Sequence, residues 1–213
     1  MAPDSYRLRR LSGGDSSDLF RQIAVLHAEL IHGGVLPLLG VEFLATLYRE
    51  IAGSAAGSVH AAVQGDRVVG FACGASDAWR CALGLSPTGY LRLLSTLALR
   101  VWRPKILWKV CDSLAYPFRE PSALTPGMPR QSRHRAELLA LAVTPTAQGT
   151  GLGLALVRAF EATLRGKADE YFVMTNAADA VINRYYSALG YLKVGQKRHH
   201  DLTIQVYTKR VGD

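Results

Sequence analysis

A glycine-rich loop in the second half of the chain constrains the fold more than any other segment. It follows an apolar strand predicted over residues 137–143, and it leads into an amphipathic helix predicted over 151–165. Glycines let the backbone approach a ligand closely, and the first helical turn adds unsatisfied N–H groups and the positive end of the helix dipole. These features predict an anion site suited to a pyrophosphate. The loop consists of Gln148, Gly149, Thr150, Gly151, Leu152 and Gly153.

Two other phosphate-binding glycine loops do not match this spacing. A dinucleotide-binding GxGxxG motif that starts at Gly149 or Gly151 needs its third glycine where a leucine stands. A P-loop needs Gly-Lys followed by Ser or Thr, whereas the only Gly-Lys pair, at 166–167, precedes Ala168. The spacing therefore supports neither a dinucleotide-binding fold nor an NTPase.

The remaining periodicity predicts an α/β fold, with a mixed sheet of about seven strands flanked by helices. Strands are expected over 6–11, 59–64, 67–75, 137–143, 170–175, 191–195 and 202–209. Helices are expected over 15–31, 40–51, 151–165 and 176–189. Ser16 or Ser17 is the predicted cap of the first helix, and Val181 is among the residues expected to be buried on the last.

The net positive charge is concentrated in residues 78–135. This segment holds ten Lys/Arg and two Asp/Glu, while the rest of the chain holds fifteen of each. We interpret it as a basic insertion within a single domain over 1–213, with helices over 87–102 and 104–114 and a loop over 121–135. Such a block attracts nucleic acid, acidic lipid, a phosphorylated substrate or cofactor phosphates, or it is a solvated basic face.

Several features favour a cytoplasmic protein. Residues 1–11 are polar and charged, unlike a signal peptide. The longest apolar stretch, 90–110, is interrupted by arginines, lysines and a proline, which argues against a transmembrane span. Cys73, Cys81 and Cys111 form no CxxC pair, as is typical of reduced thiols without structural zinc.

Three segments carry motifs in a fixed order. Residues 136–145 are similar to the fourth strand of one known family, including the Val-x-Pro at the end of that strand. Gln148-x-x-Gly151-x-Gly153 is similar to the signature Q/R-x-x-G-x-G/A of the same family, and residues 183–191 are similar to its later motif N-R-F-Y-x-x-x-G-F. On these motifs the sequence resembles the GNAT superfamily of N-acetyltransferases over 136–191. The resemblance is moderate over 1–76 and 192–209 and absent over 78–135. It implies the GNAT fold, with acetyl-CoA as acyl-donor cosubstrate and no metal.

The resemblance also implies how the cofactor is held. It assigns the pyrophosphate to the backbone N–H groups of 148–153, and it pairs the pantetheine arm with the strand like an added strand. An asparagine at the position of Asn183 often binds the cofactor arm in this family. Asn176 has the same predicted role, or it caps the following helix. The expected contacts outside the glycine loop are Leu141, Ala142, Val143, Asn176, Asn183 and Tyr186.

The general acid implied by the resemblance is Tyr186, which matches the family tyrosine near the thioester sulfur. It stands four residues before Gly190 and can protonate the leaving CoA thiolate. Its neighbour Tyr185 is interpreted as a core residue.

The candidate base is Glu137, eleven residues before Gln148, a spacing that resembles the base glutamate of the histone-acetylating branch. It would take a proton from the amine, directly or through a water. The alternatives are a strand-end carboxylate that lies in solvent or pairs with Arg133 or Arg135, with the base then supplied by ordered water or by the histidines of the loop at 199–201.

The predicted reaction is direct acetyl transfer from acetyl-CoA to the amine of a small molecule. The basic insertion suits an anionic acceptor such as a nucleotide-linked amino sugar. A protein or peptide acceptor docked through the insertion and a non-catalytic acyl-CoA-binding module are the alternatives. Residues 87–114 allow contact with a membrane surface, a homodimer is allowed, and nucleic acid is not expected because no docking motif is present.

Overall fold

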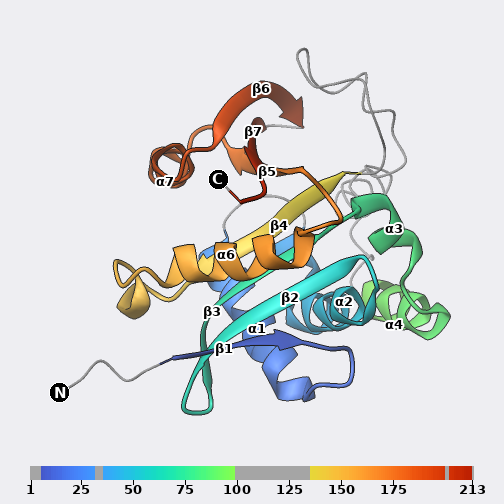
Figure 1. Cartoon of the computed structure of the whole chain (residues 1–213). Coiled ribbons are helices and arrows are strands. Elements are labelled where there is room, and N and C mark those ends of the chain that lie inside the picture. The colour runs from blue at the N-terminus through green and yellow to red at the C-terminus, as the bar shows by residue number, and fades with distance from the viewer. Residues whose placement is uncertain (1–5, 32–35, 99–134, 200–201, 213) are drawn as a thin grey trace.

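A seven-stranded mixed sheet forms the centre of the fold, with strand order β1-β2-β3-β4-β5-β7-β6 (Figure 1). The computed structural model describes residues 6–31, 36–98, 135–199 and 202–212. Neighbouring strands are antiparallel except β4 and β5, which run parallel. The predicted mixed α/β sheet is thus confirmed. Its strands are β1 (Arg7–Leu11), β2 (Gly57–Gln64), β3 (Arg67–Ala75), β4 (Ala136–Val143), β5 (Glu170–Asn176), β6 (Leu192–His199) and β7 (Leu202–Arg210).

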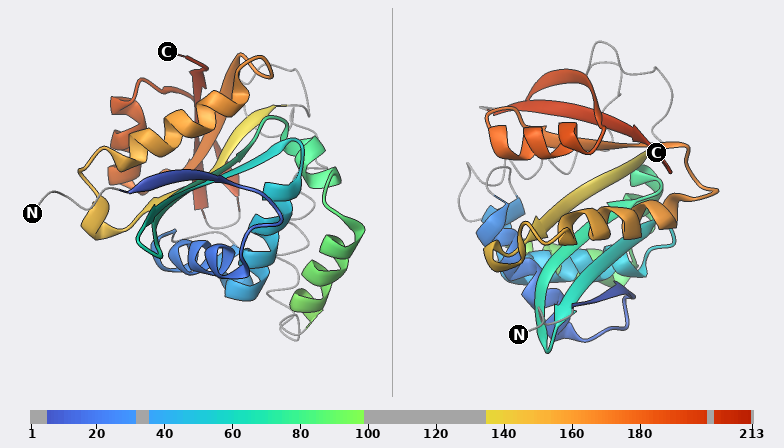
Figure 2. Two further views of the ribbon diagram at one scale, coloured as in Figure 1. Left: turned by 60° about the horizontal axis from the view of Figure 1, so that its bottom comes forward. Right: turned by 60° about the vertical axis from the view of Figure 1, so that its left-hand side comes forward.

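Helices cover both faces of the sheet (Figure 2). One buried cluster joins α1 (Ser17–Leu30) and α2 (Val41–Gly53) to β1, β2 and β3. A second joins α6 (Leu152–Leu164) and α7 (Ala180–Ala188) to the opposite face. The inward residues predicted for α6 are all buried, because they recur every fourth position along one side of the helix: Leu152, Leu156, Phe160 and Leu164.

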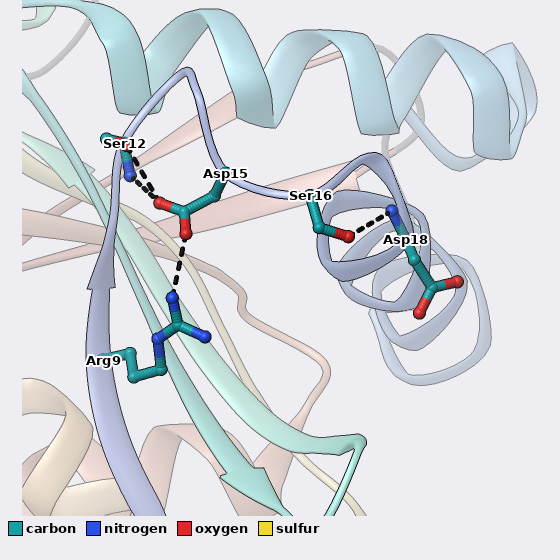
Figure 3. Close-up of polar contacts among 5 residues, drawn as sticks. All are labelled: Arg9, Ser12, Asp15, Ser16 and Asp18. Carbon is teal, nitrogen blue, oxygen red and sulfur yellow. Dashed lines mark hydrogen bonds and ion pairs between the residues drawn. The ribbon is translucent and has the colours of Figure 1, made fainter.

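A compact polar network begins α1 (Figure 3). The N–H and hydroxyl of Ser12 donate to Asp15 Oδ2 at 2.7 and 2.9 Å, and Arg9 Nη2 donates to Asp15 Oδ1 at 2.9 Å. The Ser12 N–H is the main cause that lowers the pKa of the Asp15 carboxyl, and the Ser12 hydroxyl and Arg9 add to it. Ser16 Oγ then accepts from the N–H of Asp18 at 3.1 Å, which confirms the predicted cap.

The last helix differs from the prediction at its start. Asp179 caps α7 by accepting from the N–H of Ile182 at 3.0 Å, so the helix begins after the expected residue 176. Asn176 is therefore not the cap; its Oδ1 accepts from the N–H of Ala178 in the preceding turn at 3.0 Å. Val181 lies in the first turn of this later-starting helix and is 79% exposed, so the prediction that it is buried was wrong.

The basic segment is described only in part. It begins with a short helix that the sequence did not predict, α3 (Ala78–Leu83), capped by Asp77. The next helix, α4 (Pro87–Ala98), agrees with the predicted start and packs on α2 through Leu93. The helix predicted over 104–114 and most of the loop predicted over 121–135 lie outside the described residues. The domain boundaries stay a prediction.

Two shorter 3-10 turns complete the described fold: η1 (Leu36–Leu39) before α2, and η4 (Pro145–Ala147) after β4. Cys73 and Cys81 are buried free thiols. Within the described ranges, no helix combines the length and apolar character that a membrane crossing requires.

Candidate active site

Strands β4 and β5 pair over three residues and then separate. Residues 136–138 lie opposite 171–173, and no pairing follows within the described part of the two strands. A bulge at Leu139 accompanies the separation, since Cys73 and Gly74 of β3 pair with the residues on either side of it. Figure 1 shows the two strands diverging beyond this point. The later part of β4 therefore presents a backbone edge toward β5 that no described strand pairs with.

The direction of the β4 backbone follows from one hydrogen bond. The Thr144 N–H donates to the Val69 carbonyl of β3 at 2.9 Å. Because backbone groups alternate in direction along a strand, those of Ala142 also point to β3, while those of Leu141 and Val143 point toward β5. Two of the three predicted arm contacts thus have backbone groups on the open edge, and Ala142 lies between them.

The glycine loop presents donors that the protein leaves unsatisfied. Gly149 and Gly151 have positive φ angles of 76° and 84°, and a Cβ on either would meet no atom within 4 Å. Gly151 begins α6 without a side-chain cap, and the first turn holds no acidic residue. Among the described residues, nothing accepts from the backbone N–H groups of 149–154. The loop thus has the free donors that the predicted anion site requires, and the binding of an anion there stays a prediction.

Gln148 connects the glycine loop to the end of β4 by hydrogen bonds. Its side-chain Nε2 donates to the Val143 carbonyl at 3.0 Å, and its backbone N–H donates to the Thr144 carbonyl at 3.1 Å. The hydroxyl of Thr150 donates to the Ala147 carbonyl at 2.7 Å. The hydrogen bonds of Gln148 thus fix the shape of the loop. The backbone N–H groups without an acceptor among the described residues are those of residues 149–154.

Tyr186 lies within an aromatic cluster on α7. Its ring is 4% exposed and lies 5.4, 5.0 and 6.0 Å from the rings of Tyr185, Tyr191 and Tyr207. Burial, followed by Tyr191 and Tyr185, raises the pKa of its hydroxyl far above the ordinary value. A phenol held in the protonated form can donate to a leaving group, as the predicted acid must.

Asn183 fixes α7 to the sheet. Its Nδ2 donates to the carbonyls of Asn176 and Ala177 at 3.0 and 3.2 Å, and its Oδ1 accepts from Thr175 Oγ1 at 2.6 Å. The Tyr207 hydroxyl adds a bond to the same Oδ1 at 3.2 Å. The amide that the resemblance assigned to the cofactor arm thus makes hydrogen bonds within the protein that anchor α7 at the end of β5, and its contact with the cofactor stays a prediction.

Glu137 is buried in the part of β4 that pairs with β5. It is 5% exposed and lies beside Phe172 in the sheet register. Arg135 Nε stands 4.0 Å from Glu137 Oε2, and the Arg135 guanidinium lies 5.4 Å from the Phe172 ring centroid. The predicted pairing with Arg135 is thus present, whereas Arg133 lies outside the described residues. The role of Glu137 as base stays a prediction.

The other candidate base lies largely beyond what the structure describes. His199 ends β6, and residues 200–201 lie outside the described ranges. No group of three His, Cys, Asp or Glu side chains able to hold a metal occurs in the described part of the chain. A site without metal remains an expectation.

Tyr185 packs against the buried cluster of α6 and α7, as its interpretation as a core residue implies, but its hydroxyl lies beside the glycine loop. The Tyr185 hydroxyl is sealed from solvent, has no hydrogen-bond partner among the described residues, and lies against Gly153 at the start of α6. The available signal was a small one: the motif that the sequence resembles has Phe at this position, and this chain has Tyr.

Comparison with known proteins agrees with this geometry. The model of the family named FR47-like protein matches residues 119–200, which include the glycine loop and Tyr186. A search of curated protein sequences found no significant match.

Solved structures of acetyltransferases share the fold. A protein from Desulfovibrio desulfuricans assigned to the GNAT acetyltransferase family is 17% identical, with a TM-score of 0.56 and coverage of 98% of this chain and 100% of its own. The ribosomal-protein-S18-alanine N-acetyltransferase of Escherichia coli is 13% identical, with a TM-score of 0.53 and coverage of 98% and 96%. An acetyltransferase from Thermus thermophilus is 14% identical, with a TM-score of 0.54 and coverage of 97% of both chains.

The chain has the GNAT fold, and the family match and the fold together confirm the resemblance to the GNAT superfamily. The class of protein with which the chain shares this fold is that of the GNAT-type acetyltransferases, and residues 119–200 match the FR47-like model.

Proposed function

We propose that this chain transfers an acetyl group from acetyl-CoA directly to an amine of a small-molecule acceptor. The observation that carries the proposal is the uncapped start of α6 beside the open edge of β4. The residues fit the cosubstrate: the N–H groups of 149–154 suit a pyrophosphate, and the Leu141 and Val143 backbones suit an extended amide-containing arm. Acetyl-CoA supplies the acetyl thioester, and the side chains around it supply the proton transfers.

Tyr186 and Glu137 divide these proton transfers. The Tyr186 hydroxyl, held protonated by burial that raises its pKa, would donate to the departing thiolate sulfur. The Glu137 carboxylate would accept the amine proton, directly or through a water. Nothing in this scheme needs a covalent intermediate, because the amine attacks the thioester itself and proximity provides much of the rate.

The acceptor is proposed to carry negative charge. Ten Lys/Arg against two Asp/Glu in residues 78–135 would attract an anionic molecule to the edge of the domain where that segment joins β4. A nucleotide-linked amino sugar has the required amine and phosphates. An N-terminal amine of a protein is the second candidate, since the Escherichia coli protein with this fold is named for an alanine of a ribosomal protein. The cytoplasmic location, the homodimer and the contact of 87–114 with a membrane remain predictions.

A thiol-release assay with acetyl-CoA tests the proposal. The acceptor panel pairs a nucleotide-linked amino sugar with the same sugar lacking phosphates, and adds peptides with free N-termini. We expect thiol release that requires an acceptor and favours the phosphorylated sugar. Preference for the peptides would support the second candidate. CoA binding without thiol release across the panel would instead identify a binding module.

Two variants assign the chemistry in the same assay. Tyr186→Phe is expected to lower kcat by about 100-fold, because it removes the acid. Glu137→Gln is expected to lower kcat/KM by at least about tenfold, with partial recovery at high pH, where more amine is already neutral. Full turnover by either variant at every pH would remove that residue from the mechanism.

A further inference from the structure

The Tyr185 hydroxyl is a buried polar group that the fold does not explain. It is sealed from solvent and no described residue accepts or donates a hydrogen bond to it. Most buried tyrosine hydroxyls find a partner, and an unsatisfied one costs folding free energy. Tyr191 shows the usual situation nearby, since its hydroxyl bonds to that of Tyr171.

The position of the hydroxyl is defined by Gly153. A Cβ built on Gly153 would stand 2.7 Å from the Tyr185 oxygen, closer than real Cβ atoms approach. Gly153 does not have a positive φ, so its lack of a side chain is required here by the tyrosine and not by the backbone conformation. The two residues therefore fit each other: the absent side chain of one leaves room for the hydroxyl of the other.

Gly153 also belongs to the proposed pyrophosphate cradle. Its N–H is one of those at the start of α6 that no described residue satisfies. Tyr185 thus brings a side-chain O–H donor from α7 to the place where α6 presents backbone N–H donors. Because the hydroxyl is sealed in the free protein, an acceptor that meets these N–H groups from the side of α7 reaches the phenol once the Tyr185 side chain turns toward it.

We propose that Tyr185 is a further cofactor-binding residue, whose hydroxyl donates a hydrogen bond to a phosphate oxygen of CoA held at the first turn of α6. The inference rests on the proposed function, and it adds a contact that the motif lacks, since the motif has Phe there. Bound CoA satisfies the hydroxyl that the free protein leaves without a partner. Tyr185 then contributes to cofactor affinity, while Tyr186 contributes to the chemical step.

Binding of CoA to Tyr185→Phe, measured by calorimetry, tests this division. A hydrogen bond to a charged group contributes about 1.5–3 kcal/mol, so Kd should rise at least about tenfold. The Kd of pantetheine, which lacks phosphates, should change less than about twofold, a difference below the size of one hydrogen bond. An equal loss for pantetheine would mean that the hydroxyl meets the arm and would overturn the assignment to phosphate.

Thermal stability of the free protein separates a ligand contact from a structural one. Removing a hydroxyl that lacks a partner should leave the Tm of the free protein unchanged or raise it, while the Tm increase caused by CoA becomes smaller. The matched control is Tyr191→Phe, which removes a satisfied hydroxyl and should lower the Tm of the free protein without changing the Kd for CoA. A lower Tm for free Tyr185→Phe would show a structural role.

A double-variant cycle tests the fit between the two residues. In Gly153→Ala the new methyl collides with the Tyr185 oxygen, and we expect a loss of CoA affinity similar to that of Tyr185→Phe. With Phe at 185 the nearest atom to the methyl becomes Cζ, at 3.5 Å, which is an ordinary contact. The double variant should therefore bind CoA within about twofold of Tyr185→Phe alone.

The outcomes are distinct. If the wild-type chain binds CoA and Tyr185→Phe binds it within twofold of wild type, this inference is wrong and the proposed function stands. If the wild-type chain does not bind CoA, both are wrong.

Discussion

Helices α1 and α6 begin in opposite ways. The chain satisfies the start of α1 with its own side chains: Ser16 caps the helix, and Asp15 binds the preceding turn (Figure 3). At the start of α6 it supplies a glycine, Gly151, with no cap and no acidic residue in the first turn. In both helices the first backbone N–H groups have no partner within the helix. In α1 a side chain of the protein accepts from one of them, whereas in α6 no side chain caps the helix.

The other helix starts sharpen this contrast. Asp179 caps α7 and Asp77 caps α3. The start of α2 also has a glycine and no side-chain cap, but Glu42 places a carboxylate in its first turn. A capped start stabilises the fold, whereas the start of α6 leaves its donors and positive dipole end free among the described residues, as the proposed pyrophosphate contact requires.

The largest expected effect comes from placing an anion at the open start. Gly151→Asp puts a carboxylate beside the free N–H groups, where it would take their hydrogen bonds and repel the pyrophosphate. Because like charges in contact cost several kcal/mol, we expect CoA affinity to fall by about 100- to 1000-fold in calorimetry. Gly151→Asn is the matched control, since it has the same shape and the same left-handed backbone strain without the charge. Equal losses in both variants would attribute the effect to strain alone.

A smaller effect is expected where α7 is held by side chains. Asn183→Ala removes the bonds to Thr175 and to two backbone carbonyls, so the free energy of unfolding should fall by about 2 kcal/mol in urea denaturation. Thr175→Val, which removes one bond to the same amide and keeps the shape of the side chain, should lower it less. Unchanged stability with weakened CoA binding would instead place Asn183 among the cofactor contacts, as the family resemblance implied.

The start of α1 should respond to substitution in stability alone. Ser16→Ala removes the cap, and we expect a loss of about 1 kcal/mol in the free energy of unfolding. The Kd for CoA should not change, because this helix start lies on the other face of the sheet. A loss of CoA affinity comparable to that of Gly151→Asp would show that the two helix starts do not differ in this way.

The smallest effect is a pH dependence at the same place. The pKa of Asp15 is lowered in the folded state, chiefly by the Ser12 N–H, so its stabilisation is fully present above the unfolded pKa of about 4 and is lost as the pH falls through the lower folded value. The contribution should stay below about 1 kcal/mol, as for other ion pairs near the surface. The difference in unfolding free energy between wild type and Asp15→Asn should shrink as the pH falls from 5 to 2. If the difference stays constant with pH, the charge of the Asp15 carboxylate does not contribute to stability.

Most of the fold could be predicted because its signals are local. The inward positions of α6 follow a helical period, and Gly65-Asp66 marks the hairpin between β2 and β3. The separation of β4 and β5 could not be read in this way. Leu139, at the bulge, resembles the leucines around it, and its extra place in the strand appears only when β3 pairs on both sides. The start of α7 was misplaced because Asn176 and Asp179 are both good caps, and Asn176 still belongs to β5, where it pairs with Ile204 of β7.

The site was predictable to a similar extent. Glycine spacing indicated the anion cradle, but it could not show that both donors of Gln148 bind the end of β4. The hydroxyl of Tyr185 was interpreted as part of the core because helical spacing places a residue on a face without stating what its last atom meets. In the structure that atom meets Gly153.

The central claim is that acetyl-CoA binds at the open start of α6. A titration of the ¹⁵N-labelled protein with CoA, followed by amide NMR, observes these N–H groups directly. We predict saturable shifts at Gly149, Gly151 and Gly153, with the amides of Ser16 and Asp18 unchanged. Saturable shifts confined to another region, or none at all, would contradict the account.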